Sequence, residues 1–166
     1  MFKRMLFGAA GLSLAAVAMF GAMAPGGVSA ADPTATPTPR NHTIIGGTGV
    51  LDAQGNGVAA VRGTMDLSVS ASEGMLLVRD FNHNAVVHVD GNGQTAQWLG
   101  FTVYFGFNGS ATVKAPDAGV IVIGKDINLH VAGHGWAFLK GNGTFTANGH
   151  GPFPWTPDGA FGSVTP

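Results

Sequence analysis

Apolar and polar residues alternate from about residue 44 to residue 147, and this period of two is the feature that most constrains the fold. The clearest runs are residues 65–70, 101–105 and 127–131. A period of two places one set of side chains on a buried face and the other toward water. The runs are rich in Val, Ile, Phe and Thr, which suit a pleated surface. The sequence therefore predicts an all-β domain.

Asn-Gly pairs separate these runs and predict tight turns. The pairs are Asn56-Gly57, Asn92-Gly93, Asn108-Gly109, Asn142-Gly143 and Asn148-Gly149, and three of them belong to a Gly-Asn-Gly triplet. A two-residue hairpin needs positive φ at both central positions, which Asn tolerates and Gly accepts freely. Slightly longer turns are expected at residues 72–74 and 116–119. We expect an antiparallel meander of about 12 short strands that closes into a barrel or sandwich.

The sequence also indicates an internal repeat. Residues 47–63 and 133–149 share the spacing G-x-G-x5-G-N-G-x5-G, and residues 87–93 match residues 129–135. These offsets indicate a unit of about 43 residues, present in two copies with the opening hairpin of a third. The incomplete third copy disfavours a β-trefoil. The alternative fold is a β-solenoid, because Gly and Asn also form solenoid corners.

The two ends of the chain differ in composition from the domain between them. Residues 1–30 have the order of a secretory signal peptide: Lys3 and Arg4, an apolar run, and a small-residue site ending at Ala30. An uncleaved anchor is the alternative, since the run approaches the roughly 20 residues that span a bilayer. Residues 31–43 alternate Pro with Thr and predict an extended linker. The repeated β domain is expected over residues 44–149, followed by a Pro-, Gly- and aromatic-rich tail over residues 150–166.

This organisation resembles that of secreted bacterial β proteins, and we expect an extracellular or periplasmic location. The chain contains no cysteine, so neither disulfides nor thiolate metal sites can hold it. Without Lys3 and Arg4, six basic residues face nine acidic ones, and no basic stripe remains for nucleic acid. No later segment is apolar for long enough to span a membrane after signal cleavage.

The residues for common hydrolytic chemistry are scarce. The chain has no G-x-S-x-G and no H-E-x-x-H motif, and Glu73 is its single glutamate. A glycosidase needs two carboxylates that face each other across a cleft, whereas most Asp residues here fall at expected turns or strand ends. We therefore expect a protein that is not an enzyme and that uses no cofactor.

Three of the six histidines form a candidate metal site: His88, His130 and His134. Imidazole suits zinc or copper, and His88 and His130 occupy matching positions of the repeat. If strands of the two units lie side by side, these two imidazoles would approach each other. The alternative is that they are solvated strand residues. Residues 80–84 begin like a calcium loop, but the later positions of the motif fail, which favours an Asx-rich turn.

Four aromatic residues are candidates for binding a ligand: Trp98, Tyr104, Trp136 and Trp155. Exposed aromatic rings on a β surface can stack on sugar rings, and Tyr104 is expected on the opposite face from Phe101 and Val103. Core packing is the alternative for Trp136. The sequence thus favours a secreted, non-catalytic β module with a structural or surface-interaction role, through self-association or an extracellular polysaccharide. A small carbohydrate-binding module is the alternative, and a metal-binding protein or a hydrolase is less favoured.

Overall fold

The computed structural model describes residues 45–157 and 160–162, and it confirms an antiparallel all-β fold. The predicted signal peptide and linker lie outside the described residues. The strands are β1 (Ile45–Asp80), β2 (Val86–Trp98), β3 (Phe101–Ala147), β4 (His150–Pro154) and β5 (Ala160–Gly162). No helix long and apolar enough to cross a membrane occurs in these described ranges.

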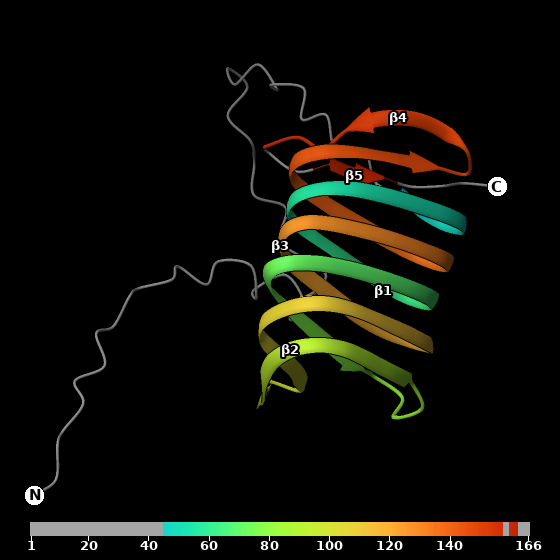
Figure 1. The fold of residues 1–166 in the computed structure, drawn as a ribbon. Coiled ribbons are helices and arrows are strands. Elements are labelled where there is room, and N and C mark those ends of the chain that lie inside the picture. Colours follow the sequence, from blue (N-terminus) through green and yellow to red (C-terminus); the bar gives the residue numbers. More distant parts are fainter. Residues whose placement is uncertain (1–44, 158–159, 163–166) are drawn as a thin grey trace, which may run out of the picture. The chain divides into compact units, whose positions relative to one another are not determined.

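Strands β1 and β3 wind side by side around a common axis (Figure 1). We call this wound sheet the coil, and each turn of a strand around the axis a pass. Along the axis, passes of β1 alternate with passes of β3. Each long strand pairs with the other at both of its edges. Met65, for example, lies opposite Ala115 at one edge and Gly133 at the other. One turn of the coil therefore takes up about 17 residues of each strand, which gives a circumference of about 56 Å.

The expected meander of about a dozen short strands is wrong. The sheet has five strands, of which β1 spans 36 residues and β3 spans 47, and it does not close into a barrel. A closed barrel joins its first strand to its last, whereas here two continuous strands advance along the axis as they turn. The coil shares this advance with a solenoid, but neighbouring passes run antiparallel because two strands coil together.

Most of the Asn-Gly pairs lie inside strands and are not hairpin turns. Only Asn148, of the five Asn residues, has positive φ, and Asn148-Gly149 forms the turn between β3 and β4. The turn between β2 and β3 is instead Leu99-Gly100, with φ of 48° and 79°. The expected turns at residues 72–74 and 116–119 are also continuous with β1 and β3.

The Gly-Asn-Gly triplets mark places where two backbones approach closely. The triplet 55–57 lies antiparallel to the triplet 141–143, with Gly55 opposite Gly143, Asn56 opposite Asn142 and Gly57 opposite Gly141. A Cβ atom on Gly57 would lie 2.2 Å from the Lys140 carbonyl oxygen. A Cβ on Gly141 would lie 2.1 Å from the Asn56 carbonyl oxygen. No side chain fits there, so glycine on both strands permits the contact.

The core lies inside the coil and follows the predicted alternation. Leu67 and Val69 are 1% and 2% exposed, whereas Asp66 and Ser68 between them face solvent. Cross-strand neighbours share a side of the sheet, so Val113 and Val131, opposite Leu67, join the same core. Among the described residues no polar or charged side chain is buried.

A second apolar layer lies on the outer side of one part of the sheet. Val103 is opposite Leu77, Leu77 is opposite Ile121, and Ile121 is opposite Ala60. These four residues are buried, yet they alternate with residues of the inner core and are not members of it. The sheet therefore has a buried apolar cluster on its outer side here, in addition to the inner core.

Replacement of a glycine at one of these close backbone contacts tests this architecture. We expect Gly141→Ala to lower the free energy of unfolding by about 3 kcal/mol or more, because the new Cβ would overlap the opposite backbone. Gly106→Ala is the control, since Gly106 has φ of 64° but no atom within 4 Å of the Cβ position. Its cost should be about 1–2 kcal/mol, from the left-handed backbone alone. Urea unfolding of both variants measures the difference, and equal costs would contradict the proposed contact.

Candidate functional site

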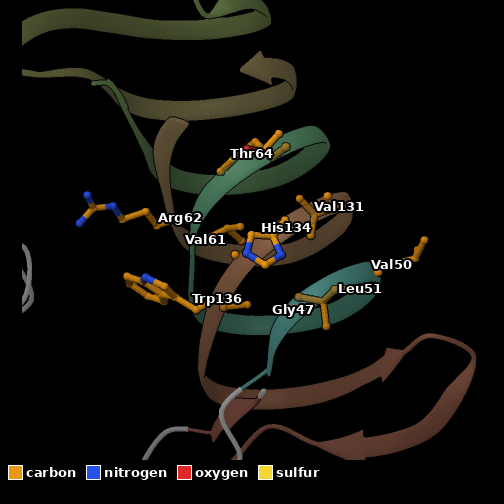
Figure 2. A pocket seen from close by; sticks show the side chains of 14 residues that line it. Gly47, Val50, Leu51, Val61, Arg62, Thr64, Val131, His134 and Trp136 are labelled. Carbon is orange, nitrogen blue, oxygen red and sulfur yellow. The ribbon is translucent and has the colours of Figure 1, made fainter. Parts of the chain in front are cut away.

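An apolar hollow brings together two of the predicted site residues, His134 and Trp136 (Figure 2). It lies where passes of β1 and β3 meet, and its lining includes Gly47, Gly49 and Gly133. His134 Nδ1 lies 3.2 Å from Thr48 Oγ1. The other lining residues are mostly apolar, so the hollow offers one imidazole and little further chemistry.

A polar face covers another part of the outer surface, and it is the most extensive arrangement of functional groups in the described chain. We define the polar face as two rows of cross-strand neighbours. The first row is His88, Thr112, Ser68, His130 and Asp52, and the second is Asp90, Ser110, Ser70, Asn128, Gln54 and Thr144. All are exposed except the half-buried Ser70. Adjacent members lie about 4.8 Å apart, so the second row is about 24 Å long.

Each of the two carboxylates on the polar face, Asp52 and Asp90, lies beside a histidine. His130 Nδ1 lies 2.6 Å from Asp52 Oδ1, and His88 Nε2 lies 3.4 Å from Asp90 Oδ2. The hydroxyl and amide groups between these pairs, at Ser68, Ser70 and Asn128, form no hydrogen bond with another described residue. The face therefore presents mainly neutral donors and acceptors to a ligand.

The predicted histidine site is not assembled. His88 and His130 belong to the same row, but Thr112 and Ser68 lie between them, which separates the two by three strand spacings, or about 14 Å. His134 contacts Thr48 in the apolar hollow instead. Within the described ranges, no three His, Asp or Glu side chains lie close enough to hold a metal ion.

A small polar hollow lies at one border of the polar face, lined by Gln54, Asn56, Asp126 and Asn128. Two residues with positive φ lie in this region: Asp126 (φ 49°) in the lining, and Glu73 (φ 48°), which pairs with the neighbouring Lys125.

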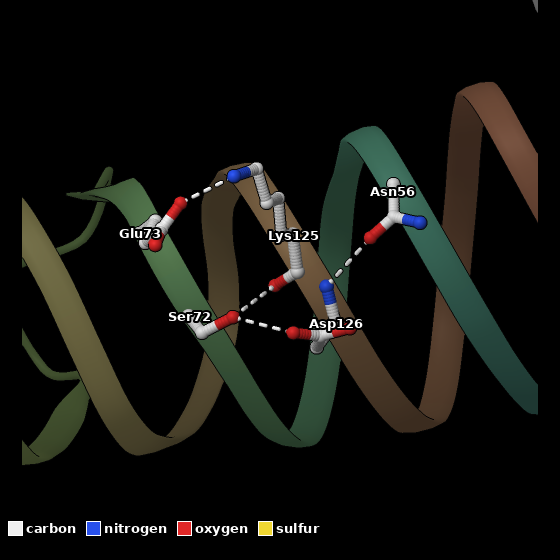
Figure 3. Close-up of polar contacts among 5 residues, drawn as sticks. All are labelled: Asn56, Ser72, Glu73, Lys125 and Asp126. Atoms are coloured by element: carbon white, nitrogen blue, oxygen red, sulfur yellow. Dashed lines mark hydrogen bonds and ion pairs between the residues drawn. The ribbon is translucent and has the colours of Figure 1, made fainter.

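The contacts of these residues are shown in Figure 3. Ser72 Oγ donates to Asp126 Oδ2 over 2.6 Å, and the Asp126 amide donates to Asn56 Oδ1 over 2.8 Å. Lys125 pairs with Glu73, which raises the pKa of Lys125. The Asn of the first Gly-Asn-Gly triplet thus fixes a neighbouring backbone, a role that its sequence pattern did not indicate.

The four predicted aromatic residues do not form a common platform. Trp155 is 4% exposed, and its Nε1 donates to the Thr144 carbonyl oxygen over 3.1 Å, so it packs into the core. Tyr104 is half-buried and packs against the inner core from the opposite side of the sheet to Val103. Trp136 is half-buried in the apolar hollow, and Trp98 is 36% exposed at the end of β2. Trp98 is the most accessible of the four for a ligand.

The segment that begins like a calcium loop is an Asx-rich turn. Asp80 Oδ1 accepts the Asn82 amide over 3.1 Å, and Oδ2 accepts the Ala85 amide over 2.7 Å. The hydrogen bond from Ala85, with smaller help from Asn82 and His83, lowers the pKa of Asp80. Both carboxylate oxygens are thus already used by the backbone of this loop.

Comparison with protein-family models, with curated protein sequences and with solved structures finds no match for this chain. Its site must therefore be interpreted from its own residues. The polar face and the polar hollow beside it are the surfaces with most hydrogen-bonding capacity, whereas sequence reasoning had selected histidines and aromatic rings one by one. The signal that could have found the polar face is the outward set of each alternating run, which is rich in Ser, Thr, Asn and Asp.

The Asp80 carboxylate gives a testable pH dependence. Because its folded-state pKa is lowered, the ionised group stabilises the fold above its unfolded pKa near 4, and this contribution is lost as pH falls through the folded value. We expect Asp80→Asn to lower stability at pH 7 by no more than about 1 kcal/mol, since water screens the group. The difference from the unchanged chain should shrink toward pH 2. Thermal unfolding across pH measures it, and a difference that grows at low pH would contradict the assignment.

Proposed function

We propose that this chain is a secreted, non-catalytic β module that binds an extended, hydroxyl-rich extracellular polymer along its polar face. The observation that carries the proposal is the regular array of hydroxyl, amide, imidazole and carboxylate groups in two rows of cross-strand neighbours. A polymer with hydroxyl groups offers donors and acceptors along its length, and such a ligand can contact one row over several strands. Because Asp52 and Asp90 already interact with His130 and His88, the face favours a neutral polysaccharide over a strongly charged one.

The scaffold supports this role because the polar face has little freedom to rearrange. Most passes beneath it are hydrogen-bonded to neighbours on both edges, and their inward side chains are packed in the core. A ligand therefore meets groups that already hold fixed positions, which reduces the entropy lost on binding. The polar hollow adds a carboxylate, Asp126, and the amides of Asn56 and Asn128 at the border of the face.

Removal of neighbouring polar groups from the face tests the proposal. We expect the combined change Ser70→Ala and Asn128→Ala to raise the dissociation constant for a bound polysaccharide about tenfold, since two hydrogen bonds of about 0.5–1.5 kcal/mol each are lost. Binding is measured by depletion of the protein onto cellulose, chitin and peptidoglycan particles. Gln94→Ala, an exposed neutral change outside the polar face, is the control and should bind unchanged.

Two outcomes would contradict the proposal. One is the absence of saturable binding to every particle, and the other is binding that the Ser70 and Asn128 changes leave intact. The second candidate function, sugar stacking on an exposed aromatic ring, rests on Trp98 at the end of β2. It predicts the opposite ranking, in which Trp98→Ala abolishes binding and the polar-face change does not.

A further inference from the structure

The two ends of the coil are finished differently. At one end, β4 pairs with β3 and carries Pro152 and Pro154, while the buried Trp155 closes the core. At the other end lies β2, which among the described strands pairs with β3 alone. An unpaired edge attracts other strands, and proteins usually protect it with Lys, Pro or a bulge. The 13 residues of β2 contain no Pro, Lys or Arg, and the pairing of β2 with β3 has a single irregularity, between Asn92 and Gln94.

The free edge of β2 carries the third Gly-Asn-Gly triplet, Gly91-Asn92-Gly93, at its centre. The other two triplets pair with each other inside the chain, first Gly to last Gly and Asn to Asn. Such a pairing is symmetric about an axis through the two Asn residues, so one triplet is complementary to a second copy of itself. On its inner edge, the third triplet lies against Asn108 and Gly109, and its outer edge has no described partner.

Gly93 differs from the glycines that pair inside the chain. A Cβ atom on Gly93 would lie 3.1 Å from the Phe105 carbonyl oxygen, whereas the glycines of the two internally paired triplets allow only 2.1–2.5 Å. The described chain therefore accounts for glycine at 91, where the corresponding distance is 2.3 Å, better than it accounts for glycine at 93. A second strand against the free edge supplies a reason for both.

We propose that a second copy of this chain pairs with β2 along this edge, antiparallel, about a two-fold axis through Asn92. Gly91 then lies opposite Gly93 of the second copy, Asp90 opposite Gln94, His88 opposite Ala96, and Val86 opposite Trp98. No two like charges face each other in this register. The pairing repeats between two chains the contact that joins β1 to β3 within one chain.

Two of the three large exposed apolar residues of β2, Val86 and Trp98, fit this register. Val86 is 70% exposed and Trp98 is 36% exposed in the single chain. They stand at opposite ends of β2 and point to the same outer side of the sheet, so the symmetric pairing brings each against the other in the second copy. An aromatic–β-branched cross-strand pair is favourable. The dimer therefore covers apolar surface at both ends of the new ladder.

The inference goes beyond the proposed function, because it uses the edge of β2. Of the second row of the polar face only Asp90 lies on that strand, and the other five members remain outside the dimer contact. Sedimentation velocity of the protein between about 1 and 100 µM tests it. We expect a monomer–dimer equilibrium without larger species, since the symmetric contact closes. The Ser70 and Asn128 changes should leave this equilibrium unaltered, so loss of polymer binding and loss of dimer are separate results.

Charges at the axis give the sharpest variants. In Asn92→Lys or Asn92→Asp alone, two like charges meet on the axis, and we expect the dimer to dissociate at least tenfold more readily. An equal mixture of the two variants should restore a mixed dimer. Asn142→Lys is the matched control, because this exposed Asn belongs to a triplet that is already paired. It should dimerise like the unchanged chain.

Val86→Ser provides a second route if the axis variants do not fold, since a 70% exposed side chain contributes little to the fold. It should weaken the dimer and leave thermal unfolding of the monomer unchanged. A monomer at every concentration would overturn the inference. So would a dimer or polymer that neither the axis charges nor Val86→Ser affects, because assembly would then use another surface.

Discussion

The close contact between the backbones of paired glycines is the constraint on which this structure depends. Two strands of 36 and 47 residues must bend continuously around a narrow core. A circumference of about 56 Å corresponds to a diameter of about 18 Å between backbones, which side chains from opposite walls fill without a lumen. At Gly57 and Gly141, and again at Gly63 and Gly135, the strands come so close that any Cβ would overlap a carbonyl oxygen. Neighbouring passes can pair at these positions because the glycines carry no side chain.

Pairing at both edges follows from this geometry and determines what the surface can do. A pass in the middle of the coil has neighbours above and below, so its backbone groups are used within the chain. Side chains alone remain for recognition along most of the coil, as on the polar face. Free backbone groups are concentrated at the ends, and only one end carries the proline-containing β4 and the buried Trp155. The proposed polymer site and the proposed dimer contact therefore occupy different kinds of surface.

The alternation of residues was sufficient to predict an all-β fold and the inward set of side chains such as Leu67, Val69 and Leu129. The antiparallel pairing was expected from Asn-Gly hairpins, and it is observed although most of these pairs are not turns. These patterns could not predict the architecture, because an Asn-Gly pair can form a hairpin turn or can lie inside a strand where two backbones approach closely. Asn148-Gly149 forms a turn, whereas Asn56-Gly57 lies inside β1 at a close backbone contact, although the two dipeptides are identical in sequence. The turn at Leu99-Gly100 was missed for the opposite reason, since a leucine with positive φ is rare.

The candidate site was less accessible from the sequence than the fold. His88 and His130 both lie on the outer side of the sheet, but their separation depends on which strands lie between them. That order arises from pairing between residues far apart in the chain, such as Ser68 with both Thr112 and His130. Trp155 was expected to bind a ligand, but it is buried and donates a hydrogen bond to the Thr144 carbonyl oxygen, 11 residues earlier in the chain. A local pattern contains neither kind of information.

Backbone Overhauser effects in solution test the central claim most directly, which is that β1 pairs with β3 at both edges and passes straight through its Gly-Asn-Gly triplet. The coil predicts that Met65 shows cross-strand contacts to both Ala115 and Gly133, and that Asn56 shows contacts to Asn142. Contacts between Gln54 and Ala59, together with a single partner strand for Met65, would place a hairpin turn at Asn56-Gly57. That result would contradict the account.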